Sequence, residues 1–213
     1  MNTAMKWVLI SVGAIVVFLA LVVLIFIIEM TPDRGEEKAV KENAKQYIDR
    51  HYSGQMEIYD TLYDNMGNFP DFTYAAKVRD TSNGVQFLIY DRNGEGAMGD
   101  DYAISALEEE LEEAILDEID ERFVNISMIS TTYTDDDLPL GYQGTTTIPS
   151  IRDMEFSEPT IGIWLTRKKQ PSDERKVAEL VTILQNEVKV PHASVIVHYQ
   201  GMERGEGSYV ESY

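Results

Sequence analysis

The sequence predicts an α+β protein, in which an N-terminal single transmembrane helix is followed by a mainly antiparallel sheet packed by helices, with a C-terminal β-α-β unit. Three observations support this prediction. A long uncharged apolar segment opens the chain, runs of alternating apolar and polar residues lie in the middle, and apolar residues at helical spacing flank those runs. A chain of 213 residues has room for one domain or two small ones beside a membrane segment.

The apolar segment runs from Trp7 to Ile28 as "WVLISVGAIVVFLALVVLIFII" and contains no charge. Its 22 residues would extend for about 33 Å as a helix, which is enough to cross a bilayer. The segment is longer than the apolar region of a cleaved signal peptide, and its end, "FIIEMTP", has no small-residue cleavage pattern. We therefore expect an uncleaved signal anchor with Trp7 and Ile28 at its two ends.

The charges around this segment bear on its orientation. Lys6 precedes it, whereas Arg34, Lys38, Lys41 and Lys45 follow it, a count that by itself places the C-terminal side inside the cell. Large domains nevertheless translocate regardless of such charges, and the following domain is acidic and free of cysteine. We expect a cytoplasmic N-terminus and an extracytoplasmic C-terminal domain at the cell membrane.

The composition excludes several kinds of function. The chain has 18 Lys and Arg against 37 Asp and Glu, a net charge of −19, so it repels nucleic-acid phosphates. Because it contains no cysteine, disulfides, thiolate zinc sites, cysteine nucleophiles and a lipid-modified cysteine are all excluded.

The patterning divides the chain into seven parts. These are a short N-terminal tail at 1–6, the transmembrane helix at 7–28, a juxtamembrane linker at 29–35, an acidic α+β domain at 36–133, a long loop at 134–158, a β-α-β unit at 159–200 packing on or beside the main domain, and a flexible tail at 201–213.

Each element of the domain follows from its periodicity. Helical spacing predicts a helix over 36–52, and alternation predicts antiparallel strands at 56–63, 72–79 and 85–91. A second helix follows "GDDY", with an acidic face that we expect to be solvated and an apolar face of Ile104, Leu107, Leu111, Ile115 and Ile119. A strand at 124–128 comes next, and the β-α-β unit contains a helix that we expect Ser172 to cap.

The stretch "YDRNGEGAMGDDY" partly matches a calcium-binding loop. Asp91, Asn93 and Glu95 occupy ligand positions and a glycine follows, but a tyrosine stands where the bidentate glutamate belongs. Asp100 and Asp101 lie just before that position and form the rest of a candidate calcium site. The favoured interpretation is a loop between a strand and a helix, in which Asp100 or Asp101 caps the helix.

Other candidate sites are weaker. Asp135, Asp136 and Asp137 form a second possible cation site, but three consecutive side chains rarely converge on one ion. His51, His192 and His198 are too scattered for a ligand pair, and a glycosylation sequon at Asn125 lies within a predicted strand. The sequence has no phosphate-binding glycine loop, serine elbow or histidine zinc motif, so it predicts no cofactor and no enzyme.

Several stretches together resemble those of a known group of proteins. The helix ending "AKQYIDRHYSG", the runs "FTYAAKVRD" and "VQFLIYD", and "GDDY" opening a helix resemble membrane-anchored extracytoplasmic proteins of Gram-positive bacteria, over about residues 36–122. The resemblance implies a compact α+β, cystatin-like fold outside the membrane, and it carries no catalytic residue over to this chain. This chain differs by lacking a lipobox cysteine and by adding the β-α-β unit.

The sequence favours a non-catalytic binding module with a protein partner. Its surface would be the tyrosines of the predicted strands, Tyr59, Tyr63, Tyr74 and Tyr90, or the 134–158 loop. The same tyrosines would alternatively serve as half-buried sheet packing. A second hypothesis is a calcium-regulated domain or cation-dependent hydrolase that uses the 91–101 loop. A third is a structural subunit assembled through the membrane helix. A chelator would abolish only the calcium-dependent function.

Overall fold

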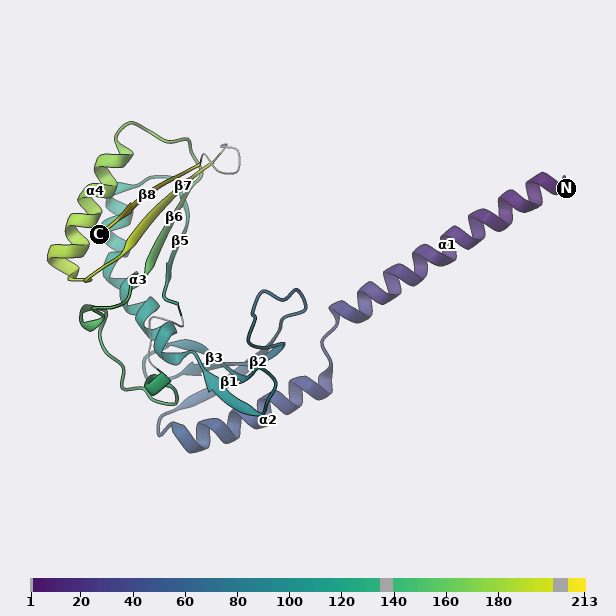
Figure 1. Ribbon diagram of the computed structural model, residues 1–213, viewed down its shortest axis with the longest axis horizontal. Helices are drawn as coiled ribbons and strands as arrows, with labels where there is room; N and C mark the ends of the chain where they lie inside the picture. Colours follow the sequence, from purple (N-terminus) through teal and green to yellow (C-terminus); the bar gives the residue numbers. More distant parts are fainter. Residues whose placement is uncertain (1, 135–139, 201–206) are drawn as a thin grey trace.

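The computed structural model describes residues 2–134, 140–200 and 207–213. Helix α1 (Thr3–Met30) projects away from a folded α+β domain, as Figure 1 shows, and its described side chains from residue 11 to residue 30 are exposed. By length and composition α1 can cross a membrane. The predicted α+β class and the long apolar N-terminal helix are confirmed, but the strands form two mainly antiparallel sheets rather than one.

The first sheet is an antiparallel meander with one helix across it. Helix α2 (Arg34–His51) precedes strands β1 (Met56–Tyr63), β2 (Tyr74–Asp80), β3 (Gln86–Arg92) and β4 (Ala97–Asp100), which pair in that order. Ala44 and Tyr47 of α2 are buried in one core with Val78, Phe87 and Ile89 of the sheet. The helix starts two residues earlier than predicted because the Asp33 carboxylate accepts hydrogen bonds from the Gly35 and Glu36 amides.

Helix α3 (Tyr102–Arg122) connects the two halves of the domain. Four of its five predicted apolar residues, Leu107, Leu111, Ile115 and Ile119, are fully buried in the second core. Most of the acidic face is exposed, as predicted, but two of its carboxylates are engaged in the fold. Glu108 accepts a hydrogen bond from the Tyr133 amide, and Glu110 accepts one from the Ser150 hydroxyl. These carboxylates therefore attach neighbouring segments to α3.

The second sheet contains strands β5 (Ile126–Thr132), β6 (Thr160–Leu165), β7 (Ser194–Tyr199) and β8 (Ser208–Ser212), in that order. Strands β6 and β7 pair in parallel, with α4 (Asp173–Ile183) and its continuation as a π-helical turn (Leu184–Val188) between them in the chain. Residues of α3 and α4 share the second core with residues of the sheet, and both helices lie on one side of it (Figure 1).

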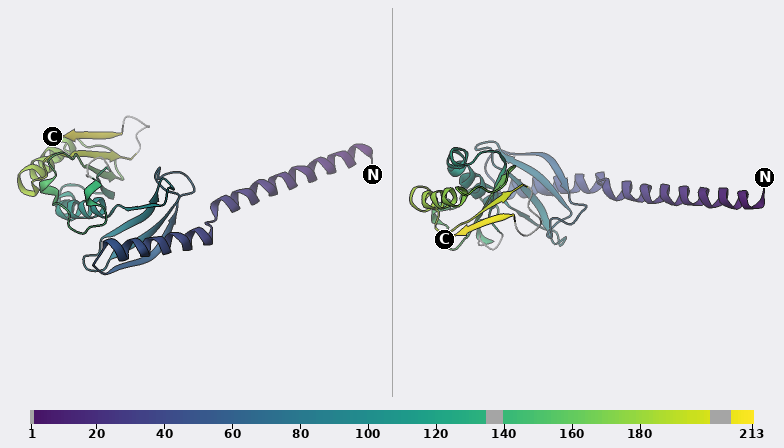
Figure 2. Two further views of the ribbon diagram at one scale, coloured as in Figure 1. Left: turned by 60° about the horizontal axis from the view of Figure 1, so that its bottom comes forward. Right: turned by 90° about the horizontal axis from the view of Figure 1, so that it is seen from above.

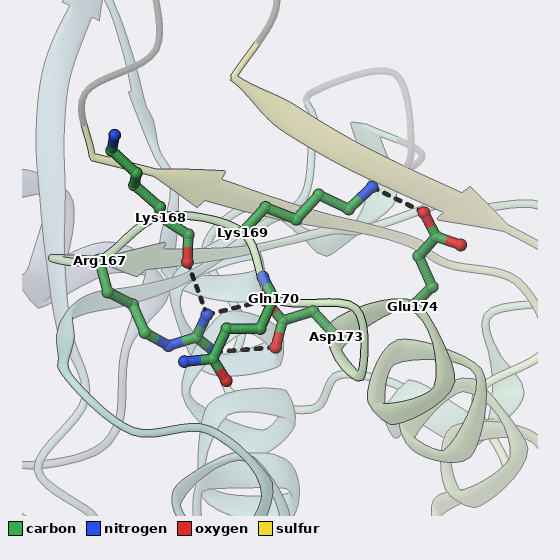
Figure 3. Close-up of polar contacts among 6 residues, drawn as sticks. All are labelled: Arg167, Lys168, Lys169, Gln170, Asp173 and Glu174. Atoms are coloured by element: carbon green, nitrogen blue, oxygen red, sulfur yellow. Dashed lines mark hydrogen bonds and ion pairs between the residues drawn. The ribbon is translucent and has the colours of Figure 1, made fainter.

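The connection from β6 to α4 corrects one predicted cap. Ser172 stands at the N-cap position but its side chain makes no capping hydrogen bond. Instead the buried Asp173 carboxylate accepts from the Gln170 amide and from both terminal nitrogens of Arg167, at 2.7 and 2.9 Å (Figure 3). These bonds hold the connection from β6 against the first residue of α4, and the bidentate pair with Arg167 adds geometric specificity.

The predicted flexible tail at 201–213 is wrong for residues 208–212, whereas residues 201–206 lie outside the described part of the chain. Residues 208–212 form β8, which pairs antiparallel with β7, and Tyr209 packs against the second core. The turn-like composition of "GMERGEGS" concealed this pairing, because a strand is stabilised by a neighbour that sequence patterning does not show.

The long connection between β5 and β6 is partly built into the fold. It carries two short 3₁₀ turns, Leu140–Tyr142 and Ile151–Asp153, and Ile151 is buried in the second core. Asp135, Asp136 and Asp137, the predicted second cation site, lie outside the described residues.

Candidate functional site

A groove of about 550 Å³ lies in the first half of the domain, bounded by α2, the β1–β2 loop (residues 64–73) and the β3–β4 turn (residues 93–96). Helix α2 contributes Val40 and Asn43 to its lining, the loop contributes Phe69 and Phe72, and Met98 of β4 lies beside them. The three segments are far apart in sequence, so the groove exists only in the folded domain.

The β1–β2 loop is held in shape by one buried carboxylate. Asp64 accepts hydrogen bonds from the amides of Met66 and Phe69, at 3.2 and 2.7 Å, and from the Asn68 side chain. These bonds, the Phe69 amide foremost, lower the pKa of Asp64. The Phe69 ring also stacks on Phe72 at 4.9 Å. The loop wall of the groove is thus ordered by its own sequence.

The β3–β4 turn also lines the groove, and it is joined to the β1–β2 loop. The Asp91 carboxylate accepts from the Gly96 amide at 2.8 Å, and the Asn93 amide donates to the Asp71 carbonyl in the facing loop. Asn93 itself has a φ of 61°, a left-handed conformation that asparagine tolerates well. This bond holds the turn and the loop together as one part of the groove lining.

The lining of the groove is unbalanced in charge. Glu36, Asp64, Asp71 and Asp91 contribute carboxylates, and the described lining includes no Lys, Arg or His. Phe69, Phe72 and Tyr74 add aromatic rings. Carboxylates next to aromatic faces attract a cation that has an apolar body.

The residues of the predicted calcium site are not brought together. Asp91, Asn93 and Glu95 lie at a tight hairpin turn, because Arg92 pairs with Ala97 across it. Asp100 is buried at the other end of β4, where it accepts from the Tyr47 hydroxyl, the Tyr102 amide and the Gly144 amide. Strand β4, which the sequence pattern does not predict, separates the two groups.

Asp101 likewise serves the fold. It accepts a hydrogen bond from the Leu88 amide and makes no side-chain cap on α3, whereas Asp100 accepts from the first helical amide. Burial raises the pKa of Asp101 to about 7. Among the residues that the structure describes, no group of three or more His, Asp or Glu side chains is placed to hold a metal ion.

The four predicted tyrosines do not share one face. Tyr63 pairs with Tyr74, whereas Tyr90 pairs with Ala75, so Tyr90 points to the side of the sheet opposite Tyr74. Tyr90 is buried, at 4% exposed, and Tyr59 is 41% exposed with Arg79 over its ring. The prediction that these four tyrosines form a single surface is therefore wrong.

Tyr63 and Tyr74 instead attach the domain to the end of α1. Their rings stack at 4.8 Å. The Tyr63 hydroxyl donates to the Glu29 carbonyl at 2.8 Å, and the Tyr74 hydroxyl accepts from the Asp33 amide at 2.9 Å. We call these two tyrosines the linker clamp. The sequence carries no signal for this clamp, because its partners are backbone groups of a distant segment.

A second surface was also missed. The sheet face away from α3 and α4 carries Trp164 stacked on His198 at 4.6 Å. Met128 and Val210 on the same sheet are about half exposed, at 49% and 54%. His198 therefore packs on an aromatic ring, and its Nδ1 is 3.0 Å from the Ser208 hydroxyl.

Fold and site together define an α+β domain that carries a long apolar helix and an acidic, aromatic groove. No protein-family model matches this chain, and neither the curated proteins nor the solved structures yield a match. The resemblance to extracytoplasmic proteins of Gram-positive bacteria therefore stays a prediction, and the function has to be argued from the groove.

Proposed function

We propose that this protein is a single-pass membrane protein that displays a non-catalytic binding module outside the cell membrane. Helix α1 crosses the bilayer with its N-terminus in the cytoplasm, and the acidic domain, with its C-terminal β-α-β unit alongside, lies on the other side. The groove between α2, the β1–β2 loop and the β3–β4 turn is the binding site. The observation that carries this proposal is the lining of that groove, with four carboxylates, three aromatic rings and no described base.

The lining favours a protein partner that presents a lysine or arginine side chain. The alkyl part of such a side chain packs on aromatic rings while its charged end meets carboxylates. Asp64 and Asp91 already accept loop amides, which leaves Glu36 and Asp71 as the carboxylates better placed to receive a ligand. Because the domain is acidic overall, long-range attraction would also speed the encounter with a basic partner.

The binding site can be tested by photocrosslinking in living cells. A photoreactive amino acid at Asn43, in the groove, should capture a partner. The photoreactive amino acid in place of Glu42 should capture no partner, because Glu42 is exposed on the same helix but lies outside the groove lining. The double variant Glu36→Gln, Asp71→Asn should reduce the adduct, and a chelator should leave it unchanged. Equal adducts from both positions, or none from Asn43, would refute the groove as the site.

The chelator arm also tests the calcium hypothesis. A calcium-regulated domain or a cation-dependent hydrolase that used the 91–101 loop would lose its adduct or activity in chelator, whichever residue carried the probe. A structural subunit that contacts its partner only through α1 would give adducts when the photoreactive amino acid is placed in α1, and none when it is placed in the groove.

The orientation has its own test. Because the chain has no cysteine, Ser53→Cys introduces a unique thiol at an exposed position beyond the end of α2. A membrane-impermeant maleimide should label it in intact cells. Labelling only after lysis would reverse the proposed topology.

A further inference from the structure

The β1–β2 loop lies beside the C-terminal end of α1. The Tyr63 hydroxyl donates to the Glu29 carbonyl, and the Asn65 side chain donates to the Met30 sulfur at 2.8 Å. In Figures 1 and 2 this loop is the part of the folded domain next to the C-terminal end of the projecting helix α1, while α2 leads away from it. The domain thus touches α1 through this loop and the strand before it.

These contacts determine the depth of the loop relative to a bilayer. The uncharged segment of α1 ends at Ile28, so Glu29 and Met30 are the first residues past the hydrocarbon region. Side chains that contact them lie at the level of the lipid headgroups, where tyrosine is the favoured residue. Tyr63 and Asn65 therefore place the following residue, Met66, at the same level.

The tip of the loop has the chemistry of a membrane contact. Met66 is 75% exposed and Phe69 is 41% exposed, although both are apolar. Asp64 satisfies the amides of both residues within the loop, so moving the tip out of bulk water would leave these donors paired. No Lys or Arg occurs between residues 56 and 76, so attraction to anionic lipid plays no part.

We propose that Met66 and Phe69 rest in the headgroup region of the bilayer that α1 crosses. This inference depends on the membrane anchoring given under the proposed function. The loop is then a second contact with the membrane and, together with the linker clamp, it holds the domain in a fixed orientation. Since the same loop forms one wall of the groove, the groove also sits next to the lipid surface.

The test uses the full-length protein in phosphatidylcholine nanodiscs with single cysteines that carry an environment-sensitive fluorophore. The cysteines replace Met66 at the loop tip, Ile25 in α1 and Ser53 beyond the end of α2, which is 18 residues or roughly 27 Å long. Label at Met66 should emit at shorter wavelength than label at Ser53 and be quenched by nitroxide at the lipid headgroup. Label at Ile25 should be quenched by nitroxide deep in the acyl chains. Adding phosphatidylserine should not increase the quenching at Met66, because the loop contains no base and the acidic domain repels anionic lipid.

The three positions separate the possible results. If Ile25 is quenched by deep nitroxide while Met66 behaves like Ser53, the loop proposal is overturned and the anchoring stands. If Ile25 is not quenched, the anchoring and the loop contact both fail. A matched variant checks the cause: with label at Asn68→Cys, the change Met66→Glu should remove the headgroup quenching. Persistent quenching in that variant would overturn the role of the apolar tip.

Discussion

Removal of the Asp173 carboxylate should destabilise the second half of the domain. Asp173 is fully buried and pairs with both terminal nitrogens of Arg167, whose side chain is only 10% exposed (Figure 3). Burial by itself opposes the charged form of Asp173, but the hydrogen bonds from Arg167 and Gln170 outweigh burial and lower its pKa. The carboxylate is therefore charged in the folded protein, and it balances the charge of the nearly buried Arg167.

The size of the effect follows from what Asp173→Ala leaves behind. Arg167 becomes a nearly buried charge without its partner, which costs about 3–5 kcal/mol. For a protein of this size that loss lowers the melting temperature by about 6–20 °C. The matched control is Glu174→Gln, because Glu174 is 58% exposed in its ion pair with Lys169. An exposed pair contributes about 0–1 kcal/mol.

Urea unfolding of the full-length protein in nanodiscs measures both changes. Trp164 lies in β6, directly before the connection that Asp173 holds, and Trp7→Phe removes the only other tryptophan. Asp173→Ala should lower the midpoint far more than Glu174→Gln does. The double variant Arg167→Met, Asp173→Leu should recover most of the loss, since an apolar pair leaves no buried charge. Equal midpoints for Asp173→Ala and Glu174→Gln would refute the reasoning.

Three further results are expected. The pKa of Asp101 is raised to about 7 from an unfolded value near 4, so its contribution to stability is full below pH 4 and is lost as pH rises to 7. The variant Asp101→Asn should therefore make the unfolding free energy less dependent on pH across that window. An unchanged pH dependence would contradict the raised pKa. The variant Tyr74→Phe keeps the ring stack but deletes the hydrogen bond to the linker. Proteolysis within residues 29–35 should therefore accelerate, while the free energy of unfolding falls by about 0.5–1.5 kcal/mol. An unchanged cleavage rate would argue against the linker clamp. The melting temperature should be unaffected by millimolar calcium. If the loop did bind calcium, a concentration of 100 times the dissociation constant would add about 2.7 kcal/mol to the free energy of unfolding. The double variant Asp91→Ala, Asn93→Ala would then remove that gain.

The sequence by itself determined the features that depend on local geometry. An uncharged run of 22 residues can only be read as a long apolar helix, and the spacing of Leu107, Leu111, Ile115 and Ile119 placed all four in the core. Strand β1 also has the predicted bounds. Helical and strand periodicities are properties of the backbone, so they are visible in any single segment.

Only the tertiary structure decided which segments meet. Strand β8 depends on its pairing with β7, and the groove requires α2, the β1–β2 loop and the β3–β4 turn together. Asp100 or Asp101 was expected to cap the following helix. Asp100 does accept a hydrogen bond from the first helical amide, whereas Asp101 accepts one from Leu88 on a neighbouring strand. A carboxylate accepts from whichever amide the fold brings within reach, so long-range packing rather than sequence spacing set its role.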